Sequence, residues 1–246
     1  MKQVNQKKQN HRAPLLLVFY MALVIPLPVY ADGSVVNKVY HPYVDALEKE
    51  IEYRSTFQDQ QPNRNNPKQI HQLSFGSAIG QSWFGEFKLI ADKSRQGEFD
   101  LEAFEFELKW QLSEQGEYSA DWGVLFEYEQ EFAEDVHEFK TGILVEKEFG
   151  RFSGAANVFF IQEWGSDIDD EFETALSLQA RYRYSRFFEP AIEYYVGQDA
   201  SGIGPVILGS LNFGVRKRLN WEAGVIFGAS KQSPNSTFRF LLEYEF

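Results

Sequence analysis

The chain ends in the stretch Asn235-Ser-Thr-Phe-Arg-Phe-Leu-Leu-Glu-Tyr-Glu-Phe246, in which apolar and polar side chains alternate. A period of two is the period of a β-strand. The apolar face of this strand is Phe238, Phe240, Leu242, Tyr244 and Phe246, and the polar face is Thr237, Arg239, Glu243 and Glu245, with Leu241 as the exception. No later segment covers the apolar face, whereas lipid covers such a face in a closed transmembrane barrel. The stretch therefore predicts the closing strand of a membrane β-barrel.

The same alternation recurs along the chain and predicts about twelve strands. Its clearest internal example is the set Phe104, Phe106, Leu108 and Trp110 against Glu105, Glu107, Lys109 and Gln111. Most segments can be drawn at the ~9–11 residues that a tilted membrane strand needs, whereas soluble strands average ~5–6. An even number of strands puts both termini on the same side of the membrane, as a bacterial single-chain barrel with periplasmic termini requires. We predict an all-β, closed, antiparallel up-and-down transmembrane barrel over residues 46–246. The alternation slips around Ala103 and Phe104, which predicts a β-bulge.

Residues 1–31 have the pattern of a secretory signal peptide. Basic residues (Lys2, Lys7, Lys8 and Arg12) precede an apolar run from Ala13 to Leu27, and small residues follow at Val29-Tyr30-Ala31. An uncleaved anchor helix is the alternative, but Pro26 and Pro28 favour cleavage. We predict a signal peptide at 1–31, an N-terminal periplasmic segment or plug at 32–45, and location in the outer membrane of a Gram-negative bacterium.

Composition excludes several classes of function. The formal net charge is −12, and removal of the four basic residues of the leader makes it −16, so nucleic acid is not an expected partner. The chain has no cysteine, which excludes disulfides and thiolate metal sites. The three histidines that follow the leader, His41, His71 and His137, lack ligand spacing. We therefore expect no metal and no cofactor.

The predicted connections alternate between short turns and longer, polar or acidic loops. The short ones are Gly80–Ser82, Ser113–Glu117, Phe149–Phe152, Ser185–Glu189 and Arg216–Asn220, and we interpret them as periplasmic turns. The longer ones, such as Glu131–His137 and Gly165–Glu171, are interpreted as extracellular loops. Aromatic residues gather at the turn ends, which predicts an interfacial girdle.

The polar faces of the strands predict a charged lumen that is rich in acid. The candidates for a constriction are Glu105, Glu107, Glu127 and Glu129, with Arg181, Arg183 and Arg239 across the barrel. In one interpretation these charges form cross-strand ion pairs that fill a narrow barrel. In the other, the surplus of acid biases a small pore toward cations or polar solutes. The two interpretations are compatible.

The sequence gives little support for an enzyme. Some outer-membrane barrels are hydrolases that use a Ser–His pair. His71 and Ser74 fall on opposite faces of one predicted strand, and His137 has no serine within its loop. The chain also lacks a G-x-S-x-G motif. We predict that the protein is not an enzyme, with a membrane hydrolase as a minor alternative.

Two regions of the chain resemble known families. The final strand resembles the C-terminal assembly signature of bacterial outer-membrane proteins, with Leu242, Tyr244 and Phe246 as the signal that the barrel assembly machinery would recognise. The segment His41–Arg54 and the hairpin Asn220–Gly228 with the final strand resemble poorly characterised proteobacterial outer-membrane barrels. These are described as putative transporters and include a group linked to meta-pathway phenol degradation. The resemblance implies a porin-like or transporter-like role without naming a substrate.

We therefore expect an outer-membrane channel that passes small polar or cationic solutes, or small hydrophobic compounds. Its other expected partners are membrane lipid and lipopolysaccharide. The first alternative is a structural or adhesive barrel, plugged by ion pairs and residues 32–44, that acts through acidic loops such as Gly165–Glu171. A soluble secreted β-protein is a further alternative.

Overall fold

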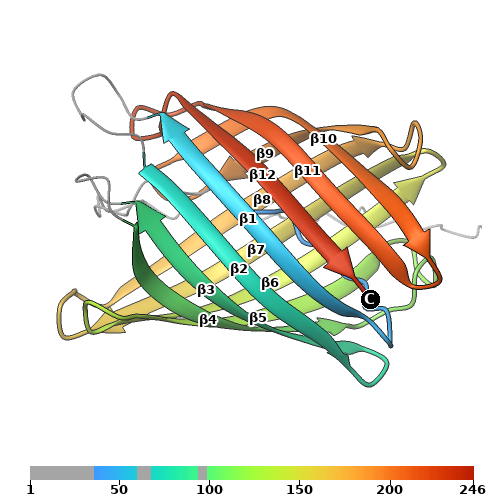
Figure 1. Cartoon of the computed structure of the whole chain (residues 1–246). Coiled ribbons are helices and arrows are strands. Elements are labelled where there is room, and N and C mark those ends of the chain that lie inside the picture. The colour runs from blue at the N-terminus through green and yellow to red at the C-terminus, as the bar shows by residue number, and fades with distance from the viewer. Residues whose placement is uncertain (1–35, 60–67, 94–98) are drawn as a thin grey trace, which may run out of the picture.

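The computed structural model describes residues 36–59, 68–93 and 99–246, and these form a closed antiparallel barrel (Figure 1). Each strand pairs with its sequence neighbours, and β1 pairs with β12. The strands are β1 (Lys49–Asp59), β2 (Lys68–Ile79), β3 (Trp83–Lys93), β4 (Phe99–Gln111), β5 (Asp121–Glu131), β6 (Val136–Phe149), β7 (Phe152–Gly165), β8 (Glu171–Tyr182), β9 (Glu189–Val196), β10 (Ser201–Gly214), β11 (Lys217–Gly228) and β12 (Ser236–Glu245). The predicted twelve-stranded all-β barrel is confirmed.

Some predicted segments lie outside the described residues. These are the signal peptide at 1–31, the first four residues of the segment 32–45, and most of two loops, at 60–67 and 94–98. Among the described residues there is no helix of the length and apolarity needed to cross a membrane.

The outer surface of the barrel is apolar because alternate side chains point outward. Each strand places at least one large apolar side chain in an exposed outward position: Ile51, Leu73, Phe87, Phe106, Trp122, Ile143, Phe160, Leu178, Ile192, Ile207, Phe227 and Phe238. The strands are 8 to 14 residues long. Most are thus long enough to cross a bilayer at a tilt. An apolar exterior on strands of this length is typical of a membrane-spanning barrel.

The last strand closes the barrel in the way that its sequence predicts. Tyr244 is the register partner of Ile51 on β1, and the backbone N–H of Phe246 donates a 2.8 Å hydrogen bond to the carbonyl oxygen of Lys49. The rings of Tyr244 and Phe246 stack with centroids 5.8 Å apart. Closure leaves no unpaired strand edge, so the sheet offers no template for pairing with another chain.

A bulge lies one residue from the predicted phase slip. Ile90 is the partner of Ala103 while the next residue, Ala91, is the partner of Leu101, so Glu102 is an extra residue on β4. Leu101 is exposed on the outer surface, whereas Ala103 is buried on the inner face. A bulge changes the phase of the alternation and increases the local twist. The sequence predicted this irregularity correctly.

The two ends of the barrel differ in their aromatic residues. We call the end that carries Lys49 and Glu245 the terminal end, and the opposite end the loop end. At the terminal end Trp83 and Trp110 are cross-strand partners, with rings stacked 4.8 Å apart. At the loop end His137 stacks on Trp164 with centroids 5.6 Å apart. The terminal-end aromatics were predicted, whereas the histidine-containing cluster at the loop end was not.

One glycine is required by close backbone approach. A Cβ atom at Gly204 on β10 would lie 1.8 Å from the carbonyl oxygen of Val225 on β11. We expect Gly204→Ala to destabilise the barrel by about 1–3 kcal/mol or more, because the two strands must separate. The matched control is Gly154→Ala, since a Cβ atom there meets nothing within 4 Å. Urea-induced unfolding in detergent measures both, and equal midpoints for the two variants would contradict this account.

Candidate functional site in the lumen

Residues 36–44, here called the lumen segment, run inside the barrel before β1 begins. The side chain of Asn157 on β7 forms hydrogen bonds with both backbone groups of Tyr40 in this segment. Its Oδ1 accepts a 2.8 Å hydrogen bond from the N–H of Tyr40, and its Nδ2 donates a 2.9 Å hydrogen bond to the carbonyl oxygen of Tyr40. One buried amide thus satisfies the two backbone groups of Tyr40, which would otherwise be costly to remove from water.

A second set of contacts holds the lumen segment at Asn37. The carbonyl oxygen of Asn37 accepts hydrogen bonds of 3.0 Å from Arg239 Nη1 on β12 and from the hydroxyl of Tyr195 on β9. Its side-chain Oδ1 accepts a hydrogen bond from Arg54 on β1. The next residue, Lys38, forms a 2.8 Å ion pair with Glu52. Asn37 and Lys38 are therefore held by β1 on one side of the β1–β12 seam and by β9 and β12 on the other.

The other end of the lumen segment contacts three further strands. His41 Nδ1 lies 2.7 Å from Glu146 Oε2 on β6. The hydroxyl of Tyr43 donates a 2.8 Å hydrogen bond to Asp121 on β5. The N–H of Val44 donates a 2.7 Å hydrogen bond to Gln111 Oε1 on β4. These contacts tie the segment to the wall along its whole length.

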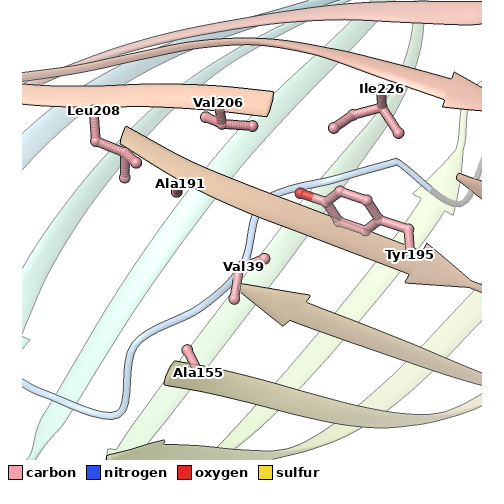
Figure 2. Packing of buried hydrophobic residues seen from close by; sticks show 7 residues of the cluster. All are labelled: Val39, Ala155, Ala191, Tyr195, Val206, Leu208 and Ile226. Atoms are coloured by element: carbon pink, nitrogen blue, oxygen red, sulfur yellow. The ribbon is translucent and has the colours of Figure 1, made fainter. Parts of the chain in front are cut away.

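Apolar side chains on the inner wall pack against the lumen segment. Val39 lies in a cluster with Ala155, Ala191, Tyr195, Val206, Leu208 and Ile226 (Figure 2). Tyr40 packs in a second cluster with Leu125, Leu144, Phe159 and Ile161. Apart from Tyr195, which alternation places on the polar face with Glu189 and Glu193, these residues were not predicted from the sequence to face inward. A signal was present, because Leu125 and Leu144 occupy the polar phase of otherwise alternating strands.

Three of the predicted lumen acids meet around one lysine. Lys88 Nζ lies 2.6 Å from Glu105, 2.6 Å from Glu107 and 3.9 Å from Glu127. The hydroxyl of Tyr40 donates hydrogen bonds to Glu127 at 2.7 Å and to Glu107 at 3.2 Å. All five side chains are buried. The lysine and the phenol together compensate carboxylates that would be expensive to bury alone.

The fourth predicted acid, Glu129, lies toward the loop end and has Glu105 as its register partner. Five inward-facing glutamates are register neighbours across five adjacent strands, and we call them the acidic row: Glu105, Glu129, Glu138, Glu163 and Glu171. Lys140 pairs with Glu138 at 3.0 Å, within the row, and with Glu127 at 2.7 Å. Like charges opposite each other on neighbouring strands destabilise a sheet. The row therefore concentrates carboxyl groups on the inner wall toward the loop end.

The predicted arginines pair with other carboxylates. Arg239 lies 2.9 Å from Glu193 and 3.0 Å from Glu222, and it is fully buried. Its ion pair with Glu193 joins β12 to β9 across the lumen, which is a contact that sequence reasoning did not identify.

The other two arginines lie toward the terminal end. Arg181 is 3.4 Å from Glu146 and 3.6 Å from Glu189, and Arg183 is 2.6 Å from Glu148. No ion pair within 4.0 Å joins any of the three predicted arginines to the four predicted acids among the described residues. The structure thus places the seven candidate residues in separate groups along the lumen.

The terminal end of the lumen opens into a cavity of about 220 Å³. Its lining includes the basic turn Arg216, Lys217 and Arg218, together with Glu48 and Glu245. Arg218 forms a 2.5 Å ion pair with Glu245. Burial raises the pKa of Glu48, while the charge of the Lys109 ammonium lowers it. The mouth therefore carries both signs of charge, unlike the acidic row.

Comparison with protein families and with curated proteins finds no match, whereas many solved structures match the chain. The COG4313 outer membrane channel from Pseudomonas putida F1 has a TM-score of 0.58 at 12% identity, over 86% of this chain and 99% of that one. The KdgM porin in complex with disordered oligogalacturonate has a TM-score of 0.54 at 12% identity, over 80% and 99%. The NanC porin has a TM-score of 0.51 at 8% identity, over 80% and 98%. These likenesses establish that the chain has the fold of outer-membrane channel barrels.

Proposed function

We propose that this protein is an outer-membrane channel for small solutes, and that the lumen segment restricts its pathway. The observation that carries the proposal is the contrast between the two surfaces of the barrel. The exterior is apolar, whereas the interior holds ion-paired charges around a short stretch of chain. A charged interior inside an apolar exterior is suited to moving polar solutes across a bilayer. The solved structures with the same fold include a channel and porins.

The acidic row supports a preference for cationic or polar neutral solutes. Its glutamates are register neighbours on the inner face, and basic residues pair with two of them, Lys88 with Glu105 and Lys140 with Glu138. A concentration of one sign of charge at a narrow opening raises the local concentration of counter-ions and hence their rate of entry. We propose that Glu129 and Glu171 contribute to selectivity in this way.

A second candidate is the passage of small hydrophobic compounds. The inward-facing apolar clusters around Val39 and Tyr40 favour it, because they place apolar side chains on the inner wall of the barrel. The resemblance to barrels linked to meta-pathway phenol degradation points in the same direction. We propose small hydrophobic compounds as a second class of solute for the same channel. We propose no enzymatic activity.

We also propose location in the outer membrane after export by the signal peptide at 1–31, with membrane lipid and lipopolysaccharide around the barrel. The outward apolar band and the aromatic residues at both ends support this location. The C-terminal residues Leu242, Tyr244 and Phe246 are proposed as the signal for the assembly machinery. They occupy the strand that closes the barrel.

Single-channel recording in a planar bilayer tests the proposed function. We expect the refolded protein, residues 32–246, to give discrete current steps and a cation preference in a salt gradient. In recordings at pH about 9, where lumen carboxyl groups are ionised, the double variant Glu129→Gln/Glu171→Gln should move the reversal potential toward zero, because it removes negative charge from the lumen. The control Glu117→Gln, in an exposed turn at the terminal end, should not.

Two results would contradict the proposal. An unchanged reversal potential in the double variant would remove the acidic row from selectivity. Absence of current from protein that is folded and inserted would favour the plugged structural or adhesive barrel, with acidic loops such as Gly165–Glu171 as its working surface.

A further inference from the structure

The lumen segment lies along the path that a solute would take through the barrel. Val36, at its start, lines a small cavity at the loop end together with Gln58 of β1. Val44, at its other end, bonds to Gln111 at the terminal end. Between the two ends, Val39 lies among side chains of β7, β9, β10 and β11 (Figure 2). The contacts of the segment therefore show what this path can bind from one mouth to the other.

The inner wall of the barrel binds the backbone of the segment as well as its side chains. Side chains of the wall form hydrogen bonds with backbone groups at three positions of the segment, Asn37, Tyr40 and Val44. Asn157 alone satisfies both the N–H and the carbonyl oxygen of Tyr40. Any peptide presents the same two groups at each residue other than proline. These wall groups are therefore suited to an extended peptide chain.

Carboxylates of the wall face the basic and phenolic side chains of the segment. The segment contributes Lys38, Tyr40, His41 and Tyr43, and the wall contributes Glu52, Glu107, Asp121, Glu127 and Glu146, at distances of 2.7 to 3.2 Å. Residues 36–44 contain no aspartate or glutamate. A peptide with carboxylates at these positions would meet like charge and leave the wall groups without partners. The wall therefore favours basic and aromatic side chains over acidic ones.

Most of these wall carboxylates also have a cationic partner on the wall itself. The pairs are Glu52 with Arg54 at 2.6 Å, Glu107 with Lys88 at 2.6 Å, Glu127 with Lys140 at 2.7 Å and Glu146 with Arg181 at 3.4 Å. A buried carboxylate that loses every partner is strongly destabilising. Because these four keep a partner when the segment leaves, the wall can exchange its own segment for another peptide.

We propose that the lumen binds short peptides with basic and aromatic side chains, and that residues 36–44 occupy this binding site until such a peptide displaces them. The inference rests on the proposed channel function, because it names a class of solute for that channel. Residues 45–48 form a short turn that ties the segment to β1. A short tether gives the segment an effective concentration of roughly millimolar, so the segment is a built-in competitor of the solute.

Isothermal titration of the folded protein, residues 32–246, in detergent with a synthetic peptide of residues 36–44 tests the proposal. The double variant Lys38→Ala/Tyr40→Ala weakens the tethered segment and leaves every wall residue unchanged. We expect one peptide per chain, bound about ten-fold or more tightly by this variant than by the wild type, because the competing segment has lost hydrogen bonds to charged groups.

A second peptide and two wall variants test the specificity of the site. A peptide that carries Lys38→Glu and His41→Glu should bind about ten-fold or more weakly, because its carboxylates would face Glu52 and Glu146. In the background of the double variant, Glu52→Gln should weaken binding of the unchanged peptide. The matched control Glu138→Gln, whose carboxylate pairs with Lys140 on the same strand, should bind that peptide as the background does.

Equal affinity for the two peptides, or no binding by the folded double variant, would overturn the proposal. The wild type should rank the two peptides in the same order at higher concentrations, so the test does not depend on the folding of the variant. Titration needs no current through the barrel, which separates this inference from the channel function. Current without peptide binding would remove the peptide site alone, whereas peptide binding without current would support the site and contradict the channel.

Discussion

Replacing Lys88 by methionine is expected to lower the free energy of unfolding by about 3–5 kcal/mol. Lys88 lies 2.6 Å from both Glu105 and Glu107 and 3.9 Å from Glu127, and all four side chains are buried. Methionine fills similar space but leaves the carboxylates without their cation. Urea-induced unfolding, followed by tryptophan fluorescence in lipid vesicles, measures the change.

Two further variants separate this cause from a general effect of substitution. Lys147→Met removes a lysine whose ammonium lies 5.8 Å from the centre of the Phe149 ring, and we expect it to change stability by only about 0.5 kcal/mol or less. The double variant Lys88→Met/Glu107→Gln should recover part of the loss, because one fewer uncompensated carboxylate remains. A Lys88→Met protein as stable as the Lys147→Met protein would show that the carboxylates do not depend on Lys88.

Removing residues 36–44 is expected to increase single-channel conductance several-fold. The lumen segment occupies the space between the inner walls and contacts residues of β1, β4, β5, β6, β7, β9 and β12. A barrel of twelve strands encloses only a modest interior, so one extended segment takes up much of its cross-section. Planar-bilayer recording on folded, inserted protein compares the two forms.

A point variant gives a second measurement in case the deletion fails to fold. Asn157→Leu removes both hydrogen bonds to the Tyr40 backbone while keeping a similar volume. We expect longer or more frequent open events without a change in strand content, as measured by circular dichroism. Equal conductance in the wild type, the deletion and Asn157→Leu would mean that ions do not pass where the segment lies.

The fold could be predicted from sequence because its cause is local. Each strand carries its own alternation, and the irregular phase near Ala103 corresponds to an extra residue at Glu102. Alternation in the final strand indicated which of its faces points outward, and the strand's apolar face indicated that it closes the barrel. Residues far apart were not needed for any of these inferences, since the period of two is a property of the strand itself.

The arrangement inside the lumen could not be predicted in the same way. Alternation correctly placed Glu105, Glu107 and Glu127 on the inner face, but which cation they meet depends on strand register and on the lumen segment. Residues 36–44 have no strand alternation, and Tyr40 reaches Asn157 across 117 residues of sequence. Which of the predicted acids contact Lys88 depends on residues that are close in space but distant in sequence, and no short sequence pattern encodes such contacts.

The hydrogen bond from Arg239 to Asn37 joins residues 202 positions apart. Contacts of such long sequence separation form late, because closing a large loop costs entropy before the contact can stabilise anything. Asn37 also needs Arg54 on the first strand and Tyr195 on β9, so its full set of partners exists only after the seam between the first and last strands has formed. The interior of this protein is therefore expected to order as the last event of its biogenesis, after the wall that encloses it is complete.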